Sequence, residues 1–245
     1  MKRGSRFFLT AAALVLAWEA AALILRTGVL PEPVPVARTF FGLLSADLPM
    51  HFGVSFYRVA AAVFLAVAAG LPLGLFMGRS KTWDAYLAPA VYLTYPVPKI
   101  VLLPIILLLL GLGDASKVAI IALILFFQIL VTVRDAVRGI DEEYFLAVRS
   151  LNARGWAVLR HVVLPATVGE LLTALRISVG TAVAVLFFVE SIGARRGLGY
   201  FIQDAWARLD YLEMYAGILA MSLLGVLLYE ALEQTEKRVC RWKRV

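Results

Sequence analysis

Apolar segments long enough to cross a membrane recur along the chain and constrain its fold more than any other feature. They run over residues 7–25, 54–77, 86–114, 116–133, 166–190 and 214–232. A helix crosses the hydrocarbon core with about 20 apolar residues, so these segments predict about six transmembrane helices. With 62% hydrophobic residues and a mean hydropathy of +0.85, the chain exceeds what a soluble core can bury. The expected fold class is therefore an all-α polytopic membrane protein.

The N-terminal segment allows two interpretations. Residues 1–6 are basic and residues 7–25 are mostly apolar, as in a secretory signal peptide. A signal peptide has a shorter apolar region and a small-residue cleavage site, whereas this segment continues past Glu19 for a full span. We therefore favour an uncleaved first helix. Residues 1–245 contain no internal repeat and no Ser/Gly-rich linker, which indicates a single transmembrane domain.

The connection over residues 27–51 is rich in proline, with Pro31, Pro33 and Pro35 at every second position. Proline lacks an N–H and disrupts a helix interior. We therefore expect an extended connection here, followed by a short amphipathic helix over residues 37–44.

Small residues recur at every fourth position of the second apolar segment. Ala66, Gly70, Gly74 and Gly78 would share one face of a helix. Such a strip lets another helix approach closely. We expect packing inside the subunit rather than a dimer interface.

Proline interrupts the third segment at Pro89, Pro96, Pro98 and Pro104. A broken helix at membrane depth requires protein or a water-filled cavity to cover the freed backbone groups. Lys99 follows the break. Its charge indicates either a pathway or a partner, or else a side chain that extends to the membrane interface.

The fourth and fifth segments contain polar residues that lipid cannot satisfy. The fourth includes Gln128 and Thr132. The fifth should be an interior helix, in which Arg176 pairs with an acidic group or reaches toward the cytoplasmic side. Its polar and glycine positions are Glu170, Arg176, Ser178, Gly180, Thr181 and Glu190.

Residues 139–165 carry charges of both signs between two apolar runs and must face water. Asp141 suits a helix N-cap, and Glu142 and Glu143 follow in the first turn, where the helix dipole favours negative charge. Asn152 tolerates the left-handed conformation that ends many helices. These signals predict a helix of about three turns over residues 141–151.

This predicted helix has an apolar stripe, made of Phe145, Ala147, Val148 and Leu151, in a segment that faces water. Such a stripe needs a partner other than lipid. A second amphipathic piece is expected over residues 156–163, before Leu164 and Pro165 begin the next span.

Lys and Arg residues concentrate at both termini, at Arg79 and Lys81, and in the loop 139–165. Cytoplasmic segments carry such an excess, so we expect both termini and this loop in the cytoplasm. Arg195 and Arg196 lie outside in that arrangement, against the trend. The net charge of +7 needs no nucleic-acid partner, because the basic residues flank apolar runs and form no stripe.

Motifs for catalysis or metal binding are missing from the sequence. It has no Gly-x4-Gly-Lys-Ser/Thr phosphate loop, no His-Glu-x-x-His and no nucleophile elbow. One cysteine, Cys240, excludes an internal disulfide, and two dispersed histidines, His51 and His161, are too few for a metal cluster. We expect a chain that is not an enzyme and that needs no cofactor or metal.

The spacing of Ala147, Asn152, Val162 and Leu164-Pro165 resembles the cytoplasmic EAA loop of ABC importer permeases, a coupling helix that docks into a groove of the ATPase subunit. The usual glutamate of that loop is Leu146 here, and the usual glycine is Asn152. The resemblance implies contact with the ATPase through Glu143, Leu146, Ala147, Val148, Arg149, Leu151, Asn152, Ala153 and Arg154.

Four further stretches resemble permeases of importers for nitrate, taurine and aliphatic sulfonates: YPVPKIVLLPIILLLLGLGDASKVAII, FFQILVTVRDAVRGID, HVVLPATVGELLTALRISVG and ESIGARRGLGYFI. Close relatives of that group serve pyrimidine precursors of thiamine and riboflavin. The resemblance implies a permease homodimer in the bacterial inner membrane, two cytoplasmic ATPases and an extracytoplasmic solute-binding protein. The second hypothesis is a channel or secondary carrier that works without ATP, although such carriers often show inverted repeats and none is visible.

The polar groups of the third, fourth and fifth spans predict a translocation path at a two-fold dimer interface, with the first and sixth spans outside it. Two copies of Lys99 near a shared cavity would favour an anionic solute. Positive charge at Arg195, Arg196 and Arg208 near the outer mouth is compatible with the same solute class. The predicted path residues are Tyr95, Lys99, Gln128, Ser178, Thr181 and Glu190.

Overall fold

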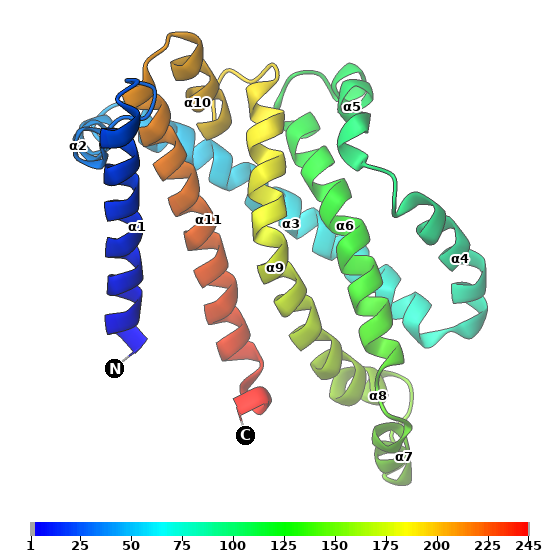
Figure 1. Ribbon diagram of the computed structural model, residues 1–245. Helices are drawn as coiled ribbons and strands as arrows, with labels where there is room; N and C mark the ends of the chain where they lie inside the picture. The colour runs from blue at the N-terminus through cyan, green and yellow to red at the C-terminus, as the bar shows by residue number, and fades with distance from the viewer. Residues whose placement is uncertain (1–2, 245) are drawn as a thin grey trace. The chain divides into compact units, whose positions relative to one another are not determined.

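The computed structural model describes residues 3–244, and every regular element within them is a helix (Figure 1). The expected all-α membrane fold is confirmed. The longer helices are α1 (Arg3–Leu25), α2 (Pro33–Leu43), α3 (Leu48–Arg79), α4 (Lys81–Thr94), α5 (Leu103–Leu110), α6 (Asp114–Arg138), α7 (Glu142–Ser150), α9 (Leu164–Ser191), α10 (Leu198–Ala207) and α11 (Tyr211–Val239). Short pieces are a 3-10 turn at Lys99–Leu102, α8 (Trp156–Val158), a π-helical turn at Leu159–Val163 and a 3-10 turn at Arg241–Arg244.

Most of the expected spans correspond to helices long and apolar enough to cross a membrane. Within the described residues these are α3, α6, the continuous helix Trp156–Ser191 and α11. The pair formed by α4 and the segment Lys99–Leu110 passes the same test together, which gives up to five spans. The apolar part of α1, Leu9–Leu25, is shorter. Its role as a sixth span stays a prediction.

Internal contacts divide the chain into two compact units. The first comprises Met1–Ser55 and Glu190–Leu224, and the second comprises Phe56–Val189 and Gly225–Val245. The single domain expected for residues 1–245 stays a prediction.

In the first unit, a contact between aromatic rings joins α1 to α11, and close packing at a glycine joins α11 to α10. The rings of Trp18 and Tyr215 stack with centroids 6.0 Å apart, and Trp18 Nε1 donates to the carbonyl of Pro31 at 3.0 Å. Gly217 leaves room for α10, because a Cβ there would lie 2.8 Å from the side chains of Phe201 and Ile202. The helix α10 was not predicted from the sequence.

The expectation of an extended, proline-rich connection is wrong in part, because α2 begins at Pro33 and includes Pro35. Both prolines lie in the first turn of the helix. The first four N–H groups of a helix have no intrahelical acceptor, so a missing N–H there removes no hydrogen bond. The predicted helix over residues 37–44 was therefore correct in type and started too late.

In the second unit, the strip of small residues on α3 packs directly against α6. A Cβ at Gly78 would lie 2.5 Å from Val137 Cβ, and one at Gly74 would lie 2.8 Å from the carbonyl oxygen of Leu130. Ala66 is buried as well. The expected packing within the subunit is confirmed.

The third span is broken as its prolines predicted. Helix α4 ends at Thr94 and the chain resumes at Lys99, and the two halves meet at 80°. Figure 1 shows α4 and α5 as separate helices joined by a connecting segment.

Candidate coupling loop and solute path

The water-facing segment forms the expected helix. Helix α7 (Glu142–Ser150) is one residue shorter at each end than predicted, and in Figure 1 it lies beyond the end of α6. Asp141 has the extended backbone of an N-cap, and its carbonyl accepts from the Tyr144 N–H at 3.2 Å. Its side chain makes no capping hydrogen bond. Glu142 and Glu143 occupy the first turn, where they complement the helix dipole.

The end of α7 is fixed by Asn152, whose φ is +58°. The N–H of Asn152 donates to Arg149 O at 2.9 Å, and the N–H of Ala153 donates to Val148 O at 3.1 Å. This pair of bonds is the Schellman motif, which requires a left-handed residue at the position of Asn152. The prediction that Asn152 keeps the turn normally made by glycine is confirmed.

The structure divides the predicted apolar stripe of α7 between two faces. Phe145 and Val148 are partly buried, and Phe145 lines a cavity shared with the helix ends of the second unit. Ala147 and Leu151 are exposed, Leu151 by 81%. Tyr144, Leu146 and Trp156 are exposed as well. We call the exposed set Tyr144, Leu146, Ala147, Leu151 and Trp156 the docking face.

The remaining predicted coupling residues lie on the other side or at the rim of the loop. Arg149, Asn152, Ala153 and Arg154 line the same cavity as Phe145, and Glu143 is exposed in the first turn. The second amphipathic piece is present over residues 156–163 as α8 and the π-helical turn, and it continues without a gap into α9.

Lys99 has a role that neither sequence interpretation included. Its Nζ donates to the carbonyls of Thr94 (2.9 Å) and Tyr95 (2.5 Å). In an unbroken helix the Thr94 carbonyl would accept from residue 98, but Pro98 has no N–H. The ammonium also suits the negative end of the α4 dipole and lies 4.6 Å from the centroid of the Phe127 ring of α6. Lys99 and Tyr95 are thus brought together at the break.

The other predicted path residues differ in their surroundings. Gln128 on α6 is half-buried and Thr181 on α9 is exposed. Ser178 is buried and donates to the carbonyl of Ala174 at 2.6 Å, so its hydroxyl already has an acceptor within α9. These three side chains belong to the second unit. Whether they contact a solute stays a prediction.

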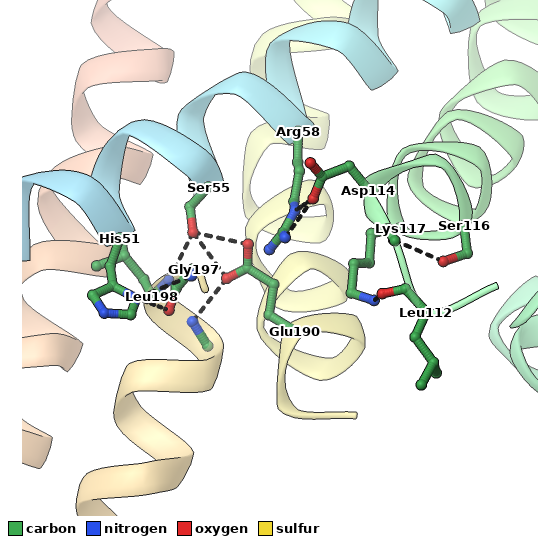
Figure 2. A network of polar contacts seen from close by, with 12 residues as sticks. His51, Ser55, Arg58, Leu112, Asp114, Ser116, Lys117, Glu190, Gly197 and Leu198 are labelled. Atoms are coloured by element: carbon green, nitrogen blue, oxygen red, sulfur yellow. Dashed lines mark hydrogen bonds and ion pairs between the residues drawn. The ribbon is translucent and has the colours of Figure 1, made fainter. Parts of the chain in front are cut away.

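Glu190 belongs to the first unit and is fully buried in a polar network (Figure 2). Its carboxylate accepts from Ser55 Oγ at 2.8–2.9 Å and from the Gly199 N–H at 2.8 Å. Ser55 Oγ also accepts from the Leu198 N–H at 2.8 Å. These bonds satisfy the first N–H groups of α10. In this conformation Glu190 anchors the start of α10 and has no surface open to a solute.

Sequence reasoning missed the polar residues of α3 that support these sites. His51 Nδ1 accepts from the Gly197 N–H at 3.0 Å in the first unit. In the second unit Arg58 pairs with Asp114 at 2.5 Å (Figure 2). The spacing of His51, Ser55 and Arg58, four and then three residues, places them on one helix face. That periodicity is the signal that could have identified them.

Two further charged groups are neutralised within their units. The half-buried Arg176 pairs with Glu236 at 3.3 Å, which is the first of the two alternatives expected for it. Arg208 contacts Glu213 at 2.6 Å and Asp204 at 3.0 Å, and hydrogen bonds to these carboxylates raise the pKa of its guanidinium. Arg208 therefore adds little net positive charge of the kind expected at an outer mouth.

Comparisons with known proteins show similarity over most of the chain. Residues 70–239 match the family described as binding-protein-dependent transport system inner membrane component. The taurine transport system permease protein TauC of Escherichia coli (strain K12) is 34% identical, covering 82% of this chain and 73% of TauC. The putative aliphatic sulfonates transport permease protein SsuC of Bacillus subtilis (strain 168) is 32% identical, covering 88% of this chain and 78% of SsuC.

Two further comparisons bear on substrate and fold. The formylaminopyrimidine transport permease protein ThiX of Halalkalibacterium halodurans is 28% identical, covering 94% of this chain and 93% of ThiX. A solved chain of the MetNI methionine ABC transporter, in an inward-facing conformation, has a TM-score of 0.67 at 20% identity. The match covers 78% of this chain and 95% of the MetNI chain, and it shows a similar fold.

Broken and continuous membrane helices, with a short water-facing helix between two of them, define a membrane transport subunit. The chain belongs to the family of binding-protein-dependent transport system inner membrane components. It is an ABC importer permease of the inner membrane, and its partners are an ATPase and a solute-binding protein. ATP hydrolysis therefore belongs to a separate subunit, and the hypothesis of an ATP-independent channel or carrier no longer applies.

Proposed function

We propose that this permease forms the translocation path for a small sulfonate-type anion such as taurine or an aliphatic sulfonate. The observation that carries the proposal is the 32–34% identity to the SsuC and TauC permeases over most of the chain. A pyrimidine nutrient is the second candidate. It is favoured by the ThiX comparison, which covers a larger share of both chains at 28% identity.

The path itself is proposed to lie at the two-fold axis of a homodimer, between the third, fourth and fifth spans of each copy. Lys99 supports this assignment because its ammonium is held at a helix break by backbone carbonyls and no carboxylate neutralises it among the described residues. Two such charges facing one cavity would attract an anion. Tyr95, Gln128 and Thr181 are the further path residues that we retain.

Coupling to the ATPase is proposed to occur through the docking face of α7. Its exposed apolar side chains have no partner in the described part of the chain, and a solvated helix gains stability by burying such a face. In this proposal residues 139–165 and both termini lie in the cytoplasm. Membrane lipid surrounds a single permease domain formed by residues 1–245.

The test is ATP-dependent uptake in proteoliposomes that contain the permease, its ATPase and its binding protein. Taurine, ethanesulfonate, nitrate and formylaminopyrimidine are supplied in turn. We expect uptake of a sulfonate and not of the pyrimidine, and a Lys99→Gln variant should lower the sulfonate rate more than a Lys237→Gln variant. Uptake of the pyrimidine alone would overturn the substrate assignment, and unchanged uptake by Lys99→Gln would overturn the proposed role of its charge.

A further inference from the structure

A cavity of about 960 Å³ lies in the second unit between the α7 loop and the ends of three membrane helices. Its basic lining comes from three places in the sequence. Arg79 and Lys81 lie at the junction of α3 and α4, Arg138 is the last residue of α6, and Arg149 and Arg154 belong to the loop. The cavity is therefore lined both by the coupling loop and by the helix ends.

Most of the positive charge of this cavity is uncompensated. None of its described lining residues is acidic. Only Arg138 has a carboxylate partner, Asp84, at 2.5 Å. The side chains of Arg79, Lys81, Arg149 and Arg154 make no ion pair or hydrogen bond within residues 3–244. Like charges that converge in this way repel one another, and an anion bound among them would relieve that repulsion.

The chemistry of the lining suits an oxyanion such as a phosphate group. Four of the five basic residues are arginines, whose planar guanidinium groups match a tetrahedral oxyanion with paired hydrogen bonds. A free phosphate would occupy only a small part of 960 Å³. The cavity also has an apolar wall, formed by Val137, Ile140, Phe145 and Val158, which a free inorganic ion does not need.

The position of the cavity points to the source of the phosphate. Helices α3 and α6 are long and apolar enough to span the membrane, and each ends at an arginine, Arg79 and Arg138, which is typical of a span that ends among lipid headgroups. Lipid headgroups lie at that depth, and basic pockets between helices on the cytoplasmic side bind anionic headgroups. We propose that the cavity binds the headgroup of an anionic phospholipid, with the glycerol and upper acyl chain on the apolar wall. The cytoplasmic orientation rests on the proposed function.

Such a lipid would connect the coupling loop to the membrane helices. Arg149 and Arg154 would contact the headgroup from the loop, and Arg79, Lys81 and Arg138 would contact it from the helix ends. The loop would be ordered against the membrane while its docking face remains exposed. Anionic lipid would then determine how firmly motion of an ATPase is passed to α3, α4 and α6.

Native mass spectrometry of the detergent-purified, full-length permease tests the proposal without ATPase or transport. Phosphatidylglycerol and phosphatidylcholine are titrated into wild type, into an Arg149→Gln/Arg154→Gln variant and into a matched Arg195→Gln/Arg196→Gln control. We expect wild type and the control to prefer phosphatidylglycerol at least tenfold. The loop variant should lose about thirtyfold in affinity for it, the change expected for two lost phosphate contacts.

Further variants and competition measurements distinguish the possible occupants of the cavity. Lys81→Gln alone should weaken phosphatidylglycerol several-fold, and it replaces the double variant if that variant unfolds. Full displacement of the lipid by millimolar inorganic phosphate would show a free-oxyanion site and overturn the lipid assignment. Displacement by the ATPase would assign the cavity to that subunit. Equal binding of both lipids by wild type would overturn the proposal, while the uptake test above would stand independently.

Discussion

The contact between α3 and α6 can be tested with a set of single glycine-to-alanine changes on α3. Each change adds one methyl group. A Cβ at Gly78 would lie 2.5 Å from Val137 Cβ and 2.9 Å from Arg134 O, and one at Gly70 would lie 3.0 Å from the side chain of Ile129. A Cβ at Gly53, on the same helix, would meet no neighbouring atom within 4 Å, so Gly53 is the matched control.

Two opposing effects determine the size of each change. Replacing a helical glycine by alanine favours the helix by about 1 kcal/mol. Overfilling a packed site costs about 1–3 kcal/mol. Carbon atoms in good contact are about 3.5–4.0 Å apart, so the overlap at Gly78 exceeds that at Gly70. We expect Gly78→Ala to destabilise by about 2 kcal/mol, Gly70→Ala to be near neutral, and Gly53→Ala to stabilise by up to about 1 kcal/mol.

Thermal unfolding of the purified protein in one detergent measures this order. The unfolding temperature should rise for Gly53→Ala, change little for Gly70→Ala and fall for Gly78→Ala, with Gly74→Ala between the last two. At Gly74 the nearest atoms, the backbone oxygen of Leu130 and Val133 Cβ, both lie 2.8 Å from the added Cβ, and neither can rotate away. If Gly78→Ala unfolds at the same temperature as Gly53→Ala, or above it, the close packing of α3 against α6 is refuted.

Two further predictions concern backbone geometry and buried polar groups. Because Asn152 has a φ of +58°, Asn152→Val should destabilise by about 1–2 kcal/mol while Asn152→Gly is neutral. Equal unfolding temperatures for these two variants would contradict the helix-end assignment. Glu190→Ala removes the acceptor of Ser55 and Gly199 and should destabilise by about 1–3 kcal/mol for each buried donor left unpaired. The exposed Glu230→Ala is the control, and an equal effect of both changes would show that the Glu190 network contributes nothing to stability.

Local signals in the sequence predicted local structure well. The spacing of small residues identified the face of α3 that packs closely, though not its partner α6; prolines located the break before Lys99, and Asn152 located the end of α7. Each of these features depends on a few neighbouring residues. Pro33 and Pro35 led to the wrong prediction of an extended connection. The position of a proline in the sequence does not reveal whether it will lie in the first turn of a helix or in its interior.

Tertiary contacts between distant segments were harder to predict. Glu190 looked like a path residue because a carboxylate in an apolar segment needs a partner, but its partners are Ser55, 135 residues away, and a backbone N–H of α10. Lys99 looked like a pathway charge, and the carbonyls that it satisfies are exposed only once the helix has broken. The basic cavity joins three segments, and no single stretch of the sequence carries its pattern.

The most direct test of the coupling loop is ATP-driven uptake by an Ala147→Arg variant with its ATPase and binding protein. Ala147 is exposed on the docking face, and in the proposed contact a long cation at this position would overfill the ATPase groove. Ala147→Ser keeps the side chain small and is the matched control. The account predicts at least a tenfold loss of uptake for Ala147→Arg, with normal membrane insertion and continued ATP hydrolysis, and near-normal uptake for Ala147→Ser. Normal uptake by well-expressed Ala147→Arg would contradict it.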